Sequence, residues 1–151
     1  MTKKAQFNAE EWSAVVGAPL LAAMLVIAAD RGGSLRETVA VARAYGEARE
    51  SYDSEFMSAL LATPPASDGA SGARSGDDLP QVAPAKLREA VSIVERVATE
   101  DELVEYKRFV YALAETAAHA HKEGGFLGVG GKQVSEAEQA ALDEIAAIFD
   151  E

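Results

Sequence analysis

The sequence contains no cysteine, only two histidines and no basic stretch longer than the pair Lys3-Lys4. Without cysteine, the chain forms no disulfide, thiolate nucleophile, zinc finger or iron–sulfur cluster of its own. Its formal net charge is −11 at pH 7, which repels nucleic acid and anionic membrane surfaces. We therefore expect no nucleic-acid partner.

The sequence also gives no sign of a catalytic apparatus. The two histidines, His119 and His121, lie two positions apart and so face different sides of a helix, and no nucleophile stands beside them. Acidic residues are so numerous that no catalytic carboxylate pair can be singled out. We expect a protein that is not an enzyme.

The longest apolar run, residues 14–29, contains no polar side chain. A membrane-spanning helix needs roughly 20 apolar residues. Glu10 and Glu11 precede the run, where a signal peptide would be basic. The run therefore predicts a buried core helix, kinked at Pro19, rather than a membrane span or a signal peptide. We expect a cytoplasmic location.

Helix boundaries are marked by four capping boxes, in which a short polar residue and an acid three positions later satisfy each other's backbone N–H groups. They are Asn8/Glu11, Ser34/Glu37, Thr99/Glu102 and Ser135/Glu138. No stretch has the alternation of a strand. The pattern predicts an all-α bundle of five to six helices, at about 9–29, 35–49, 53–61, 85–98, 100–122 and 136–149. Residues 35–61 also allow one long helix with a weak point at Gly46.

Residues 63–84 consist mainly of Pro, Gly, Ser, Ala and Asp, with almost nothing large to bury. Such a composition predicts a flexible linker within a single helical domain, residues 1–151. The two halves that it joins have the same order of features: an apolar helix, an acidic residue, paired glycines, a capping box and a second helix. We expect two related helical hairpins.

Two short stretches carry a family resemblance. The first is Ala28-Ala29-Asp30 followed by Gly33-Ser34-Leu35-Arg36-Glu37, and the second ends in Val134-Ser135-Glu136-Ala137-Glu138. They resemble the helix-connecting signature of the tellurite-resistance TerB-type domains. The resemblance implies an all-helical bacterial protein of two related halves, with an accessory or stress-related role and a divalent cation as ligand.

The residues that match the acidic positions of that signature are Asp30, Glu37, Glu123 and Glu138. Each half would supply two carboxylates, and oxygen ligands are what hard cations such as Ca²⁺ prefer. The alternative is structural, because Glu37 and Glu138 also complete capping boxes. A second row, Glu115, His119 and Glu123, shares one helix face and would bind zinc or iron only if another helix added a ligand. Otherwise Glu115 supports His119 on a solvated face.

The glycine-rich stretch 124–132 is not a phosphate-binding loop. Phe126 stands where such a loop needs glycine, and Gln133 where it needs serine or threonine. Three apolar residues on it, Phe126, Leu127 and Val129, either fold back on the core or form a partner contact. The sequence thus leaves two functional hypotheses. One is a TerB-like, cation-binding accessory protein, and the other is a non-catalytic interaction module or homodimer that uses this loop and Ala-rich helix faces.

Overall fold

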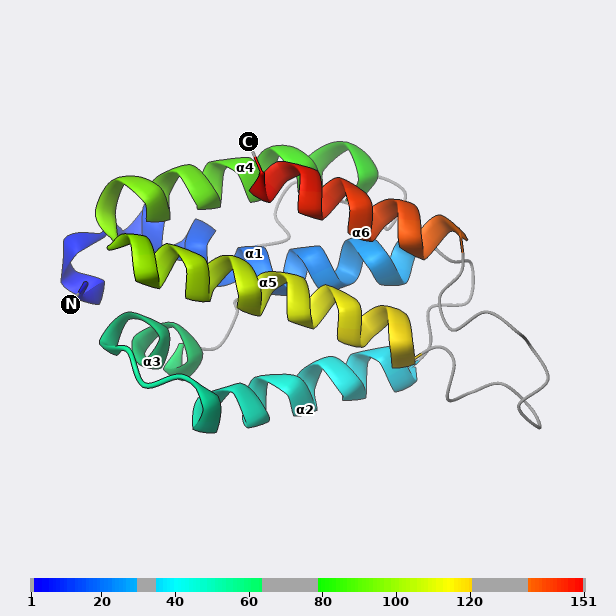
Figure 1. Cartoon of the computed structure of the whole chain (residues 1–151), viewed down its shortest axis with the longest axis horizontal. Helices are drawn as coiled ribbons and strands as arrows, with labels where there is room; N and C mark the ends of the chain where they lie inside the picture. Colours follow the sequence, from blue (N-terminus) through cyan, green and yellow to red (C-terminus); the bar gives the residue numbers. More distant parts are fainter. Residues whose placement is uncertain (1, 30–34, 64–78, 121–135, 151) are drawn as a thin grey trace.

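The computed structural model describes residues 2–29, 35–63, 79–120 and 136–150, and for residues 35–38 the backbone only. Within these ranges it is a helical bundle without strands (Figure 1). A short 3-10 turn, η1 (Lys4–Gln6), precedes the first helix. The α-helices are α1 (Ala9–Ala29), α2 (Leu35–Ser51), α3 (Glu55–Ala62), α4 (Leu79–Val97), α5 (Glu100–Ala120) and α6 (Glu136–Phe149). The predicted all-α bundle of five to six helices is confirmed.

Helix α1 is the central helix of the bundle. It contacts all five other α-helices that the structure describes, and α5 and α4 most extensively. In Figure 1, α4 and α6 lie on one side of the α1–α5 pair, and α2 and α3 on the other. Among the described helices α1 alone is long and apolar enough to cross a membrane, a test that core helices and signal sequences also pass. Ten of its residues are buried within the bundle.

Pro19 lies inside α1, which continues past it to Ala29. Because proline has no N–H, the carbonyl of Val15, four residues earlier, has no partner within the helix. The hydroxyl of Tyr106, a fully buried residue of α5, donates a hydrogen bond of 2.8 Å to this carbonyl. The bond therefore joins α5 to α1 and satisfies a backbone acceptor in the core.

A second tyrosine, Tyr45 of α2, packs its ring edge-on against Phe109 at a centroid distance of 5.4 Å. Its hydroxyl is buried and has no hydrogen-bond partner in the described part of the chain. Burial also raises the pKa of this hydroxyl. A buried hydroxyl without a partner costs free energy, so the ring of Tyr45 stabilises the α2–α5 contact while its hydroxyl weakens it.

The break between α2 and α3 follows Ser51, and Gly46 lies within α2. Ser54 begins α3, because its hydroxyl accepts a hydrogen bond from the Met57 N–H at 3.2 Å. The same hydroxyl donates to the Glu105 carboxylate of α5 at 2.7 Å. Two separate helices, rather than one helix weakened at Gly46, are therefore found here.

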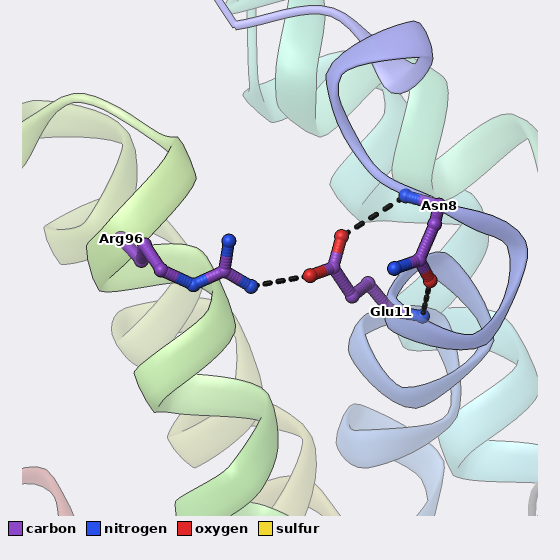
Figure 2. Close-up of polar contacts among 3 residues, drawn as sticks. All are labelled: Asn8, Glu11 and Arg96. Carbon is purple, nitrogen blue, oxygen red and sulfur yellow. Dashed lines mark hydrogen bonds and ion pairs between the residues drawn. The ribbon is translucent and has the colours of Figure 1, made fainter.

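The capping box at the start of α1 is formed as predicted. The Glu11 carboxylate accepts from the Asn8 backbone N–H at 3.0 Å, and the Asn8 side chain accepts from the Glu11 N–H at 2.8 Å. Figure 2 shows the second oxygen of Glu11 paired with Arg96 of α4. The hydrogen bond from Asn8 and the pairing with Arg96 lower the pKa of Glu11. This carboxylate therefore both caps α1 and ties it to the end of α4.

The box at the start of α5 is also formed. The Thr99 N–H donates to the Glu102 carboxylate at 3.0 Å, and the Glu102 N–H donates to the Thr99 hydroxyl at 3.3 Å. Thr2 adds two further donors to the same carboxylate, its N–H at 3.0 Å and its hydroxyl. Glu102 is thus a buried carboxylate, 4% exposed, held by two separate segments. The predicted boxes Ser34/Glu37 and Ser135/Glu138 include residues outside the described ranges.

The prediction fails at the start of α4. The expected linker ran from residue 63 to residue 84, yet α4 begins at Leu79 and contains Pro84. Leu79 and Ala83 are buried. Their contacts with the core stabilise a helical turn that the local composition alone does not predict. Pro80 is tolerated because the first N–H groups of a helix have no partner within it. The rest of the predicted linker, residues 64–78, lies outside the described ranges.

Candidate functional site

A groove runs between α2 and α5. It encloses about 550 Å³ and is open to solvent. A second hollow of about 220 Å³ continues between the same two helices, towards Ser51 and Tyr52. The lining residues of the larger hollow are Ala40, Arg43, Ala44 and Glu47 from α2, and Arg108, Tyr111, Ala112, Glu115, Thr116, His119 and Ala120 from α5.

The groove exists because small residues line its floor. On α2, Ala40 and Ala44 are one turn apart, and Ala112 contributes to the floor from α5. A methyl side chain cannot fill the space between two neighbouring helices. The rims are formed by longer polar side chains that point away from the floor into solvent, as their exposure indicates. The result is an apolar floor between two charged walls.

The way in which α2 lies against α5 decides which charged residues face each other across the groove. Tyr45 of α2 and Tyr52, the residue that follows α2, both contact the ring of Phe109, so the C-terminal part of α2 lies level with Phe109 of α5. The two helices run antiparallel (Figure 1).

From this register, Arg43 comes level with Glu115, and Glu47 lies within a turn of Arg108. Each wall therefore carries one arginine and one glutamate, and opposite signs face each other across the groove.

The two arginines of the walls, Arg43 and Arg108, form no salt bridge within the described bundle, although burial raises the pKa of the Tyr52 hydroxyl and the nearby charge of Arg108 lowers it. Both are exposed. In a chain of net charge −11, with many carboxylates available, unpaired arginines at a groove are open to an external partner.

Two large apolar side chains are exposed on these same two helices. Val39 is 52% exposed and Val104 is 49% exposed, and they are the two large hydrophobic residues that the described ranges leave exposed. Val39 lies four residues before Arg43 on α2, and Val104 four residues before Arg108 on α5, so each valine shares a helix face with an arginine of the groove, although neither valine lines it. Because the helices are antiparallel, the two valines lie towards opposite ends of the α2–α5 pair. We call this surface, from Val39 to Glu47 and from Val104 to His119, the α2–α5 face.

Of the acidic residues predicted from the family resemblance, only Glu138 is described with its side chain. Asp30 and Glu123 are not among the described residues, and Glu37 is placed in α2 by its backbone alone. Glu138 is described in the first turn of α6 and is only 1% exposed. The described residues contain no group of three or more histidine or acidic side chains that could hold a metal ion. The cation site stays a prediction.

The residues of the predicted partner loop, Phe126, Leu127 and Val129, also lie outside the described ranges. His119 is described, and its Nε2 atom lies 3.9 Å from the Glu115 carboxylate, with each side chain about half exposed. This agrees with the interpretation in which Glu115 supports His119 on a solvated helix face. The pair forms part of the α5 wall of the groove.

A third hollow, of about 390 Å³, lies between the start of α1 and the end of α4. Its polar lining includes Asn8, Glu11 and Arg96, the three residues drawn in Figure 2. Their hydrogen bonds are directed at one another and at the α1 backbone. These groups are already occupied in holding two helices together, so the groove between α2 and α5 is the stronger candidate.

Sequence reasoning missed the α2–α5 face, although a signal for it is present. Both helices contain valine followed four residues later by arginine, and a glutamate further along the same face. A valine on an otherwise charged helix face is a local exception to amphipathic patterning. The repeat of that exception on two helices indicates a surface feature rather than chance.

Comparison with known proteins does not assign the chain: no protein-family model matches it, and no curated protein and no solved structure matches it significantly. The fold and the face therefore define its class, an all-α bundle with an open, charge-lined groove between two of its helices.

The cation hypothesis has a direct test. If the acidic helix connections bind a divalent cation, the chelated protein should unfold at a higher temperature when that cation is restored. A ligand at about 100 times its Kd adds about 2.7 kcal/mol. Asp30→Asn and Glu123→Gln should abolish this rise, whereas Glu144→Gln, an exposed control in α6, should keep it. Thermal unfolding with Ca²⁺, Mg²⁺, Mn²⁺ and Zn²⁺ measures the effect, and an equal rise in all variants contradicts the hypothesis.

Proposed function

We propose that this protein is a non-catalytic protein–protein interaction module that binds through the α2–α5 face. The observation that carries the proposal is the exposure of Val39 and Val104, each of which lies one turn from an arginine that lines the groove. Exposed apolar side chains rimmed by charge mark contact surfaces in proteins. The Ala-rich floor supports the proposal further, because small residues allow another helix to approach closely.

The charged walls fit a binding role better than a structural one. Arg43 and Arg108 contribute no ion pair to the described bundle, and arginine is enriched at the energetic centres of interfaces. Tyr111 on the α5 wall is half-buried and supplies an aromatic contact of the kind that interfaces favour. A partner that covers the groove would desolvate these side chains together.

Site-specific photo-cross-linking tests the proposal in the cells that produce the protein. A photoreactive residue in place of Ala112, on the groove floor, is expected to give a discrete cross-linked protein that mass spectrometry identifies. The matched control replaces Ala147, an exposed alanine of α6 on another side of the bundle, and is expected to give none. The adduct through residue 112 should be lost when Arg43 and Arg108 are both replaced by glutamate. Equal cross-linking through residues 112 and 147, or none through residue 112, would contradict the proposal.

A further inference from the structure

We infer that the occupant of the α2–α5 face is a second copy of the same chain, related by a two-fold axis that runs parallel to the groove. This inference rests on the proposed function and names its partner. It comes from the arrangement of charge on the face, which is complementary to itself. Most protein surfaces lack this property, and an isologous dimer requires it.

The four charged residues form a square of alternating sign. Arg43 and Glu47 lie on the α2 wall, while Glu115 and Arg108 lie opposite them on the α5 wall. A two-fold axis parallel to the groove exchanges the two walls and leaves the position along the groove unchanged. Arg43 of one copy then meets the partner's Glu115, and Glu47 meets the partner's Arg108. Symmetry makes each of these contacts occur twice, which gives four interchain ion pairs.

The same operation produces a favourable helix arrangement. It lays α2 of one copy along α5 of the other, and these helices again run antiparallel. Four helices, two from each copy, then form an antiparallel bundle whose centre is the alanine floor. Alanine at 40, 44 and 112 permits close approach of the helices, and no buried polar group is placed at the centre of the contact.

The net charge of the protein also argues against self-association through an arbitrary surface. Each copy carries a net charge of −11, so two copies repel one another unless local contacts offset the repulsion. The α2–α5 face supplies such contacts because its two arginines are unpaired within the described chain. A dimer through a face without free cations would bring carboxylates together.

Sedimentation equilibrium of the full chain, from low micromolar to near-millimolar concentration, tests the inference. The wild-type protein is expected to pass from monomer to dimer across this range. Arg43→Glu and Glu115→Arg should each weaken self-association by about tenfold or more, because each single variant places like charges at both symmetric contacts. An equimolar mixture of the two variants should form a heterodimer of near wild-type affinity, since every contact in it regains opposite charges.

The charge-swapped mixture separates a surface effect from a folding defect, because two misfolded variants do not restore one another. Circular dichroism of each variant provides an independent check of the fold. A wild-type protein that stays monomeric at all concentrations contradicts the inference that a second copy occupies the face. A dimer whose stability is unchanged by both substitutions contradicts it too.

These results are distinguishable from failure of the proposed function. Cross-linking of residue 112 to another copy of this protein supports both the interaction module and the second copy as its partner. Cross-linking to a different protein supports the interaction module but contradicts the inference that the partner is a second copy. No cross-link through residue 112 contradicts the interaction module itself.

Discussion

Tyr106→Phe should lower the free energy of unfolding by about 1–3 kcal/mol, the cost of leaving a buried backbone carbonyl without a partner. The carbonyl belongs to Val15, whose helical partner is missing because Pro19 has no N–H. The Tyr106 hydroxyl replaces that partner and donates to the carbonyl at 2.8 Å, in the core between α1 and α5. Phenylalanine keeps the ring and its packing, so the loss reports the hydrogen bond alone. Urea denaturation at neutral pH measures it.

Tyr45→Phe is the matched control for this change. It removes a hydroxyl from another tyrosine that faces α5, but that hydroxyl has no partner in the described chain. The free energy of unfolding should therefore stay the same or rise, because a desolvated hydroxyl without a hydrogen bond is removed. Equal destabilisation by the two substitutions would show that the hydrogen bond from Tyr106 to Val15 does not have the role assigned to it.

Glu102→Ala should lower the free energy of unfolding by about 2–3 kcal/mol, since a charge-assisted capping network is lost. The substitution leaves the N–H groups of Thr2 and Thr99 without their acceptor and releases the segment before α1 from the start of α5. Glu100→Ala is the control, because it removes an exposed carboxylate from the same first turn of α5. The control should have a much smaller effect. Equal effects would assign the loss to the helix dipole rather than to the network.

The contribution of Glu102 should also depend on pH in a defined direction. Burial raises the pKa of this carboxyl, but the hydrogen bonds from Thr2 and Thr99 together outweigh burial and lower the pKa below its ordinary value of 4.5. A group whose pKa is lower in the folded state stabilises the fold above its ordinary pKa. That stabilisation is lost as the pH falls through the lowered value. The difference in stability between wild type and Glu102→Ala should therefore be full at pH 7 and shrink in acid.

The helices could be predicted where the signals for their ends are local. Asn8 with Glu11 and Thr99 with Glu102 satisfy backbone groups within three residues, so the sequence alone locates the starts of α1 and α5. The start of α4 could not be found in this way. Its first turn contains Pro80 and follows a polar, glycine-rich stretch, and it is helical because Leu79 packs on a core formed by distant segments.

The candidate site could be predicted only in part. The alanine content indicated helix faces suited to close contact, and this agrees with the floor of the groove. The groove itself depends on how α2 lies against α5, and no local pattern encodes that register. The lack of an ion-pair partner for Arg43 and Arg108 in the described chain is likewise a property of the fold, because a sequence this acidic offers many possible partners.

Amide hydrogen–deuterium exchange on the assembled state is the most direct test of the claim that the α2–α5 face is the contact surface. The measurement compares the free chain with the dimer, or with the partner that cross-linking identifies, and it needs no substitution. We expect new protection in peptides that cover 39–51 and 104–120, while peptides from α4 and α6 exchange at the same rate in both states. Protection centred on α4 and α6, or none on α2, would contradict the account.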